Sequence, residues 1–210
     1  MVRDTLMLGA QPEDIRRAVA VLRRGGVVAL PTDTVYGLGA HSGMAGAIEK
    51  LFQVKERERL KAIPLLIARI EHLAGVAARV PAIAWQLAER FWPGSVTLVV
   101  PKAATVLDVL TGGAPSVAVR LPAHELALQL ITALGVPLAT TSANLSGKPE
   151  TVTAEEVHEA LRGRVRVILD GGRCPGGVAS TVVDVTAGPP TILRRGAMVN
   201  EVEAFLAGVR

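Results

Sequence analysis

Polar residues of this chain follow directly after its apolar, β-branched runs. The segment 31–37 carries the hydroxyl groups of Thr32 and Tyr36 among glycine and proline, and a second apolar run ends in Ser142 and Asn144. Open α/β sheets bind ligands just beyond the carboxyl ends of their strands. We therefore expect these four side chains to line one site. The alternative is a set of ordinary turns and helix caps, in which serine, threonine and asparagine are common.

Cations stand close to these polar segments. Lys55 and Arg57 are two residues apart at the end of a predicted helix, and Arg120 ends the apolar run 116–121. An arginine within such a run is costly to bury unless a carboxylate or an anionic ligand pairs with it. A structural ion pair and a ligand-binding role are both open for Arg120. The charged run 55–61 is also typical of a solvated helix face.

A glycine-rich segment at 170–181 ends in Ser180 and Thr181 and follows another apolar run. Its backbone amides suit a nest for phosphate, and a hairpin is the alternative. Arg194, in the last apolar run, adds another cation. Many hydroxyls, four cations and few carboxylates suit a phosphorylated small molecule such as a nucleoside triphosphate.

Cys174 follows an arginine, which would lower its pKa, but a lone cysteine is more often a small buried hydrophobe.

Several familiar catalytic motifs are missing from the sequence. It has no GxxxxGK[ST] phosphate loop and no GxSxG nucleophile elbow, and its four histidines lack the spacing of metal ligands. The glycines at 37 and 39 begin a GxGxxG pattern, but Ser42 occupies the last glycine position. These absences argue against a P-loop enzyme, a serine hydrolase, a zinc enzyme and a dinucleotide-binding domain.

The composition indicates a globular chain. It has 210 residues, of which 50% are hydrophobic and 20% charged, with a net charge of +4 and a single cysteine. The 3% aromatic content argues against folds that stack RNA bases. The first 14 residues contain no apolar signal core, and Gly135 and Pro137 break the uncharged run 126–147. We therefore expect a cytoplasmic protein with one domain over 1–210 and no membrane segment.

The positioning elements alternate along the chain. Strands are expected at 27–30, 63–68, 95–100, 116–121, 136–140, 165–169, 180–185 and 191–193. Helices are expected at 12–24, 43–54, 71–91 (one or two, interrupted near Pro81), 123–134, 153–161 and 200–207. The helix at 153–161 opens with a capping box of Thr153 and Glu156. This alternation predicts an α/β fold with a mixed, twisted sheet.

Seven segments, in order, resemble those of the YrdC-like threonylcarbamoyl-AMP synthases. They are LPTDTVYGLGA (30–40), LFQVKERERLKAIPLLI (51–67), FWPGSVTLVV (91–100), SVAVRLPAH (116–124), PLATTSANLSGKP (137–149), ILDGGRCPGGVASTVVDV (168–185) and ILRRG (192–196). The KxR pair of Lys55 and Arg57 followed by the distant SxN pair of Ser142 and Asn144 is typical of this family. The resemblance implies a YrdC-like open twisted mixed sheet flanked by helices, with a concave basic ligand cleft.

The resemblance also implies a nucleotidyltransferase reaction. Such enzymes condense L-threonine, bicarbonate and ATP into threonylcarbamoyl-AMP and pyrophosphate, and a separate transferase complex then modifies tRNA. Mg²⁺ would be held mainly by the ATP phosphates, without a protein metal site.

Residue roles carry over by position. The residues expected to be catalytic and to bind the nucleotide are Lys55, Arg57, Ser142 and Asn144, with Arg194 along the nucleotide. The residues expected to bind threonine are Thr32, Tyr36, Arg120 and Ser180.

The chain departs from the family at several positions. Glu58, Ala62 and Thr141 each stand where the family often has proline, which affects the expected loop geometry. The sequence ends about fourteen residues after ILRRG, so the short, single-domain form is expected. Two other functions stay open. One is a module of ribosome maturation that binds double-stranded RNA or, weakly, tRNA, and the other is a carbamoyl-adenylating enzyme that uses carbamoyl phosphate.

Overall fold

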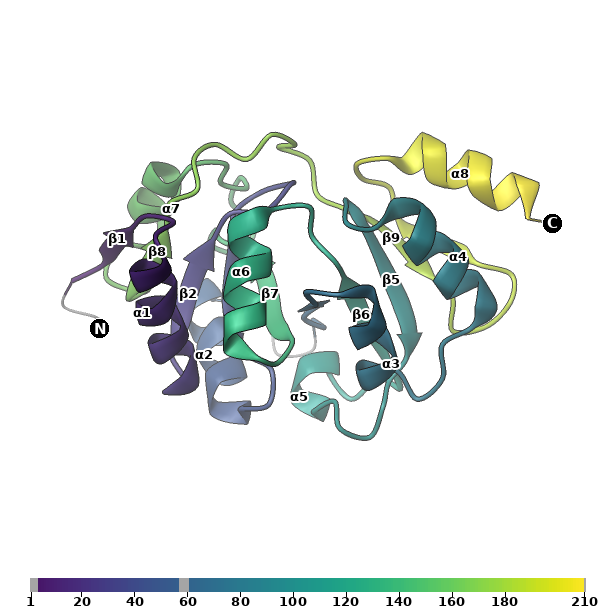
Figure 1. Cartoon of the computed structure of the whole chain (residues 1–210), viewed down its shortest axis with the longest axis horizontal. Helices are drawn as coiled ribbons and strands as arrows, with labels where there is room; N and C mark the ends of the chain where they lie inside the picture. Colours follow the sequence, from purple (N-terminus) through teal and green to yellow (C-terminus); the bar gives the residue numbers. More distant parts are fainter. Residues whose placement is uncertain (1–3, 57–60, 210) are drawn as a thin grey trace.

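Ten strands form one mixed sheet with helices on both faces in the computed structural model, which describes residues 4–56 and 61–209 (Figure 1). The strands are β1 (Leu6–Leu8), β2 (Val27–Leu30), β3 (Gly37–His41), β4 (Leu65–Leu66), β5 (Val96–Pro101), β6 (Ser116–Arg120), β7 (Leu138–Ser142), β8 (Val167–Leu169), β9 (Thr181–Asp184) and β10 (Thr191–Arg194). The helices are α1 (Pro12–Arg23), α2 (Ala45–Lys55), the 3-10 helix η1 (Ile70–His72), α3 (Leu73–Val76), α4 (Ala82–Phe91), α5 (Asp108–Thr111), α6 (Glu125–Leu134), α7 (Ala154–Leu161) and α8 (Val199–Gly208).

The strand order is β1-β8-β2-β3-β7-β4-β6-β5-β9-β10, so strands distant in sequence are neighbours in the sheet. Four neighbouring pairs are parallel (β1 with β8, β2 with β8, β4 with β6, β5 with β9), and the other five are antiparallel. The sequence-based prediction of an α/β fold with a mixed sheet flanked by helices is confirmed.

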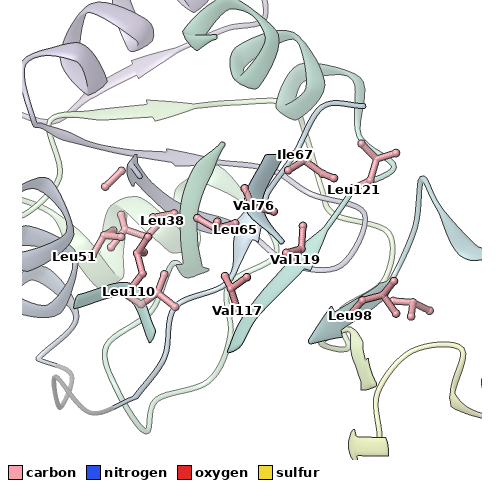
Figure 2. Close-up of a cluster of buried hydrophobic side chains, with 14 of the residues drawn as sticks. Leu38, Leu51, Leu65, Ile67, Val76, Leu98, Leu110, Val117, Val119 and Leu121 are labelled. Atoms are coloured by element: carbon pink, nitrogen blue, oxygen red, sulfur yellow. The ribbon is translucent and has the colours of Figure 1, made fainter. Parts of the chain in front are cut away.

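Two hydrophobic layers cover the two faces of the sheet. In β2, Val28 and Leu30 pack with α1 and α6, whereas Val27 and Ala29 face the larger layer that includes α2, α4 and α7. Figure 1 shows α1 and α6 side by side in front of the sheet. Figure 2 shows part of the larger layer, in which Leu38 lies near Leu51 of α2. Each face of a buried strand thus contributes to a different core.

The central strand β3 was not expected from the sequence, because glycine has low strand propensity and no apolar side chain. The structure explains the glycines. A Cβ on Gly37 would lie 2.7 Å from Thr140 Cγ2, and a Cβ on Gly39 would lie 2.7 Å from Leu138 Cδ2. Glycine therefore permits the close approach of β3 to β7.

Other differences from the expected elements are local. The short strand β1 and the one-turn helix α5 were not predicted, and the strand expected at 63–68 is reduced to the two residues of β4. The helical region at 71–91 is divided, with Pro81 as the N-cap of α4. The Thr153 half of the predicted capping box is confirmed, whereas Glu156 bonds to the residue before the N-cap instead of to Thr153 N. Thr153 Oγ1 accepts a hydrogen bond from Glu156 N at 3.2 Å, and Glu156 Oε2 accepts one from Val152 N at 2.7 Å.

The register between β3 and β7 brings two predicted site segments together. Gly37 pairs with Ser142, so the polar segment before β3 adjoins the polar turn after β7. The segment after β8 also reaches this end, because Gly172 contacts Tyr36. Among the helices of the described residues, none is long and apolar enough to cross a membrane.

Replacement of Gly39 by alanine tests the close approach. The new methyl group would meet Leu138 and Leu30, both fully buried, so we expect Gly39→Ala to destabilise the fold by about 1–3 kcal/mol. Gly46→Ala is the control, since its Cβ meets nothing within 4 Å and lies in α2. The Gly46→Ala variant should raise the free energy of unfolding by up to about 1 kcal/mol, because alanine favours the helix more than glycine does. Urea denaturation measures both, and equal midpoints for the two variants would contradict the explanation of β3.

Candidate active site

A cleft of about 220 Å³ opens where the ends of β2, β7, β5, β6 and β9 meet. Six of the nine residues singled out from the sequence line it: Thr32, Tyr36, Arg120, Ser142, Ser180 and Arg194. Lys55 and Asn144 lie directly behind Ser142, within hydrogen-bonding distance of it. Arg57 lies outside the residues that the structure describes. Segments that are far apart in the sequence therefore share one cleft.

The ammonium group of Lys55 is buried at the end of α2, with 3% of the residue exposed. Its Nζ lies 2.6 Å from Asn144 Oδ1, 2.6 Å from Ser142 O, 3.0 Å from Ser142 Oγ and 3.1 Å from Asn144 O. These oxygens belong to residues 87 and 89 positions further along the chain. The lysine thus holds the turn after β7 in one conformation, because a buried cation requires such partners.

Further hydrogen bonds fix this turn. Ser142 Oγ donates to Asn144 Oδ1 at 2.7 Å, and Asn144 Nδ2 donates to Lys148 O at 2.5 Å. The Asn144 oxygen thus accepts from both the lysine and the serine. Asn144 is 5% exposed, whereas Ser142 is partly exposed and faces the cleft. Ser142 is consequently the member of this cluster that a ligand in the cleft can touch.

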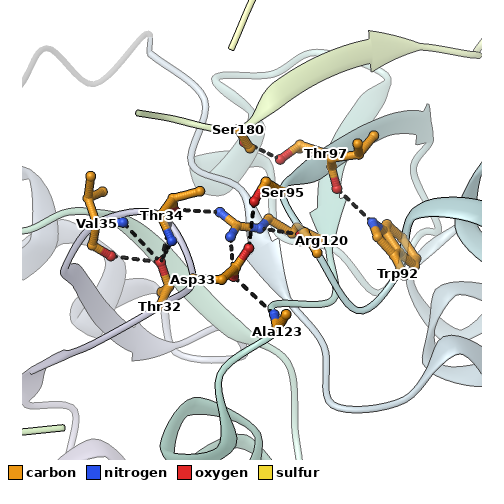
Figure 3. Close-up of polar contacts among 12 residues, drawn as sticks. Thr32, Asp33, Thr34, Val35, Trp92, Ser95, Thr97, Arg120, Ala123 and Ser180 are labelled. Atoms are coloured by element: carbon orange, nitrogen blue, oxygen red, sulfur yellow. Dashed lines mark hydrogen bonds and ion pairs between the residues drawn. The ribbon is translucent and has the colours of Figure 1, made fainter. Parts of the chain in front are cut away.

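A buried ion pair of Arg120 and Asp33 forms a second polar cluster (Figure 3). The two side chains are only 8% and 10% exposed and come from positions 87 residues apart. Arg120 also donates from Nε to Gly94 O at 2.9 Å and from Nη1 to Thr34 Oγ1 at 3.0 Å. Burial lowers the pKa of Arg120, and the neighbouring Asp33 carboxylate opposes this effect. The pairing with Asp33 offsets the free-energy cost of removing the arginine charge from water.

The carboxylate of Asp33 has partners besides the arginine. It accepts hydrogen bonds from Ser95 Oγ at 2.7 Å and from Ala123 N at 3.0 Å. Asp33 therefore joins the segments after β2, before β5 and after β6 at one point. Sequence analysis did not single it out. The available signal was that a buried arginine needs a carboxylate, and Asp33 is the carboxylate of the polar segment 31–37.

The hydroxyl of Thr32 supports the turn that carries Asp33. It donates to Val35 O at 2.7 Å and accepts from Thr34 N at 3.1 Å. The Thr34 hydroxyl lies 2.9 Å from Thr32 Oγ1 and is the donor, since the Thr32 proton is already used. Arg120, Thr34, Thr32 and Val35 thus form one directed chain of hydrogen bonds. Thr32 lines the cleft, but its hydroxyl also has this local structural role.

The far wall of the cleft is organised around Ser180. Its Oγ lies 2.7 Å from Thr97 Oγ1 and accepts a hydrogen bond from Arg194 Nη2 at 3.0 Å, while Arg194 Nε donates to Ser180 O at 3.0 Å. Thr97 and Ser180 are buried. Arg194 therefore orients the serine in addition to supplying positive charge to the cleft.

Tyr36 is fully buried and connects the cleft to the segment after β8. Its hydroxyl donates to Gly172 O at 2.8 Å. Burial raises the pKa of Tyr36, and the Asp170 carboxylate adds to the increase. Burial also raises the pKa of the Cys174 thiol, and the lowering effect of Arg173 is smaller. Cys174 is 3% exposed, as expected for a small buried hydrophobe.

The charge of the cleft comes from a few groups. Its described lining contains Arg120 and Arg194 together with one carboxylate, Glu150. Lys55 adds a positive charge behind Ser142. The concave basic ligand cleft that the resemblance implies stays a prediction. In the part of the chain that the structure describes, no group of three or more His, Cys, Asp or Glu side chains is arranged to hold a metal ion.

Comparison with known families finds one match over most of the chain. The model of the Sua5, YciO and YrdC family, described as "Telomere recombination", matches residues 20–196. Two similar proteins are threonylcarbamoyl-AMP synthases of Pyrococcus abyssi (45% identical over 197 residues) and Bacillus subtilis (41% over 204 residues). The alignments cover 93% and 96% of this chain but only 58% and 59% of these relatives. The chain therefore spans less than two thirds of their length.

A relative of similar length also exists. The threonylcarbamoyl-AMP synthase of Thiobacillus denitrificans is 38% identical over 180 residues, which are 86% of this chain and 93% of that protein.

Solved structures show the same fold. Sua5 of P. abyssi, solved in complex with L-threonine, superposes with a TM-score of 0.94 and 42% identity over 97% of this chain and 61% of that one. YciO of Escherichia coli superposes with a TM-score of 0.84 and 27% identity, over 92% of this chain and 96% of that one.

Removal of the Asp33 charge tests the buried ion pair. We expect Asp33→Asn to lower the free energy of unfolding by about 3 kcal/mol, because it leaves Arg120 buried without a counter-charge. Glu13→Gln is the matched control. It breaks the pair of Arg16 and Glu13, whose side chains are 69% and 66% exposed, and should change stability little. Denaturant unfolding of both variants measures the difference, and an Asp33→Asn protein as stable as the parent would refute a structural role for the pair.

Proposed function

The chain belongs to the family of Sua5, YciO and YrdC proteins, and we propose that it makes threonylcarbamoyl-AMP from L-threonine, bicarbonate and ATP, with release of pyrophosphate. The observation that carries this proposal is the contact of Lys55 with Ser142 and Asn144 beside the Arg120 cluster. It joins Lys55 of the KxR pair to the SxN pair across 87 residues of sequence and supports Ser142 in the wall of the cleft. The names of the relatives and the threonine complex of P. abyssi Sua5 support the same reaction.

The reaction requires no covalent bond to the protein. The amine of threonine takes up bicarbonate and loses water to give a carbamate. A carbamate oxygen then attacks the α-phosphorus of ATP, the bond to the β-phosphate oxygen breaks, and pyrophosphate leaves with the electron pair. Negative charge builds on the phosphates, so fixed cations and hydrogen-bond donors at the cleft lower the barrier. The described residues of the cleft supply donors of this kind.

Threonine is assigned to the end of the cleft that contains Arg120 and Ser180. Three of the five N–H groups of Arg120 are committed to Gly94, Thr34 and Asp33. The other two have no acceptor among residues 4–56 and 61–209, and a planar guanidinium suits a carboxylate. Thr32 and Tyr36 would complete the wall around the threonine.

The phosphates are assigned to the end that contains Ser142. Arg194, which contacts Ser180 on the far wall, would supply its charge along the nucleotide. All three protons of the Lys55 ammonium are occupied by surrounding oxygens, so it would act on the phosphates through its charge. Asn144 would act through its hold on Lys55 and Ser142. Arg57, outside the described residues, would add a second cation by analogy with the KxR pattern.

Mg²⁺ would enter with ATP. The cleft offers hydroxyl groups and the single carboxylate of Glu150, which suit an ion already chelated by phosphate oxygens better than a site built from protein ligands alone. When bound, the ion would neutralise part of the charge on the phosphates. We further propose that the product is passed to a separate transferase that modifies tRNA, and that this occurs in the cytoplasm.

Pyrophosphate release from Mg-ATP tests the proposed reaction. Release should require L-threonine and bicarbonate together, because the carbamate forms only from both. A continuous pyrophosphate assay with each component omitted in turn measures this. Release with carbamoyl phosphate in place of threonine and bicarbonate would identify a carbamoyl-adenylating enzyme instead. A folded protein that binds RNA but releases no pyrophosphate, either with threonine and bicarbonate or with carbamoyl phosphate, would support the RNA-binding alternative.

Replacement of Lys55 by methionine tests the cation behind Ser142. Lys55→Met removes the charge and leaves two buried carbonyl oxygens without this donor, so we expect pyrophosphate release to fall about 100-fold or more. Lys50→Met is the control on the same helix, where the lysine is exposed and donates to Gly25 O. It should retain parental turnover. If both variants are equally active, Lys55 has no part in the reaction.

A further inference from the structure

A second, larger hollow lies at the opposite end of the strands from the cleft. It has a volume of about 900 Å³ and is lined by the starts of β1, β2 and β8, by α1 and α2, and by the turn between α7 and β8. Val27 begins β2 in this hollow, whereas β2 ends beside the segment that carries Thr32. The hollow and the proposed active site therefore do not share a wall residue among those described. We call this hollow the basic groove.

The basic groove is strongly cationic. Its described lining contains no carboxylate and six exposed cations: Arg17, Arg24, Lys50, Arg162, Arg164 and Arg166. Only Arg164 among them has an ion pair within residues 4–56 and 61–209, to Glu56 at 2.7 Å. Six positive charges from three separate elements, in a chain of net charge +4, make this region attractive to a polyanion.

The floor of the basic groove is apolar. Leu6, Val21, Val54 and Val167 line it, and Leu6 is 41% exposed. An apolar centre surrounded by arginine is the usual arrangement of a protein–protein interface, in which arginine is enriched and lysine depleted. Five of the six cations are arginine. Because the described lining contains no aromatic side chain, it lacks the stacking surface that single-stranded nucleic acid requires.

We propose that the basic groove binds an acidic segment of a partner protein in which carboxylates are interspersed with aliphatic side chains. The carboxylates would pair with the arginines at the rim, which can bind them through two parallel hydrogen bonds. The aliphatic side chains would cover the valine and leucine floor. This combination matches both features of the groove, whereas the phosphate backbone of an RNA duplex matches only its charge. The proposal is independent of the reaction proposed for the cleft.

Binding of synthetic probes by the whole chain tests the proposal. One labelled peptide alternates glutamate with leucine, a second of equal length and charge alternates glutamate with serine, and the third probe is an RNA duplex. Fluorescence anisotropy measures each affinity for the parent and for two double variants. Arg162→Glu/Arg166→Glu reverses two charges in the groove. Arg69→Glu/Arg79→Glu reverses two exposed charges elsewhere and is the matched control.

The glutamate–leucine peptide should bind the parent and the control alike, and at least about tenfold more weakly to the groove variant. It should also bind the parent more tightly than the glutamate–serine peptide, because only leucine covers the floor. Pyrophosphate release should be the same in all three proteins. Equal loss in both double variants, equal affinity for the two peptides, absence of binding, or tighter groove-dependent binding of the RNA duplex would each overturn the proposal.

Discussion

A buried ammonium group at the end of α2 determines how the site is built. Lys55 is surrounded by four oxygens of Ser142 and Asn144, and a cation so deeply buried is tolerated only with such partners. This contact fixes α2 against the turn after β7. The register of β3 with β7, which the glycines at 37 and 39 permit, then brings the segment after β2 beside the same turn. The position of the cleft thus follows from one buried charge and one close strand pair.

The second buried cation organises the other end of the cleft by the same rule. Arg120 is neutralised by Asp33, and Asp33 also holds Ser95 and the backbone of Ala123. The two clusters differ in the number of hydrogen-bond donors that they leave available for a ligand. Lys55 has all its donors occupied, whereas two N–H groups of Arg120 have no acceptor within residues 4–56 and 61–209 and can serve a ligand. This difference is the basis for assigning a carboxylate to the Arg120 end and phosphates to the Ser142 end.

The sequence predicts the elements whose side chains alternate or repeat clearly, such as α1 with its buried Ile15 and Leu22, and it predicts that the polar segments converge. It does not predict β3, because the close approach that requires Gly37 and Gly39 depends on a strand about one hundred residues away. Asp33 was missed for a similar reason. Its partner, Arg120, is 87 residues distant, so the pair exists only after folding. Local patterns give the elements, and long-range packing decides which polar groups are structural.

The central claim is that the cleft has a carboxylate-binding end at Arg120 and Ser180 and a phosphate-binding end at Ser142. The most direct measurement is a crystal structure of the protein with L-threonine and a non-hydrolysable ATP analogue. The claim predicts the threonine carboxylate within hydrogen-bonding distance of Arg120, and the phosphates beside Ser142 with the Lys55 contacts intact. Ligands in the reverse orientation, or outside the cleft altogether, would contradict it.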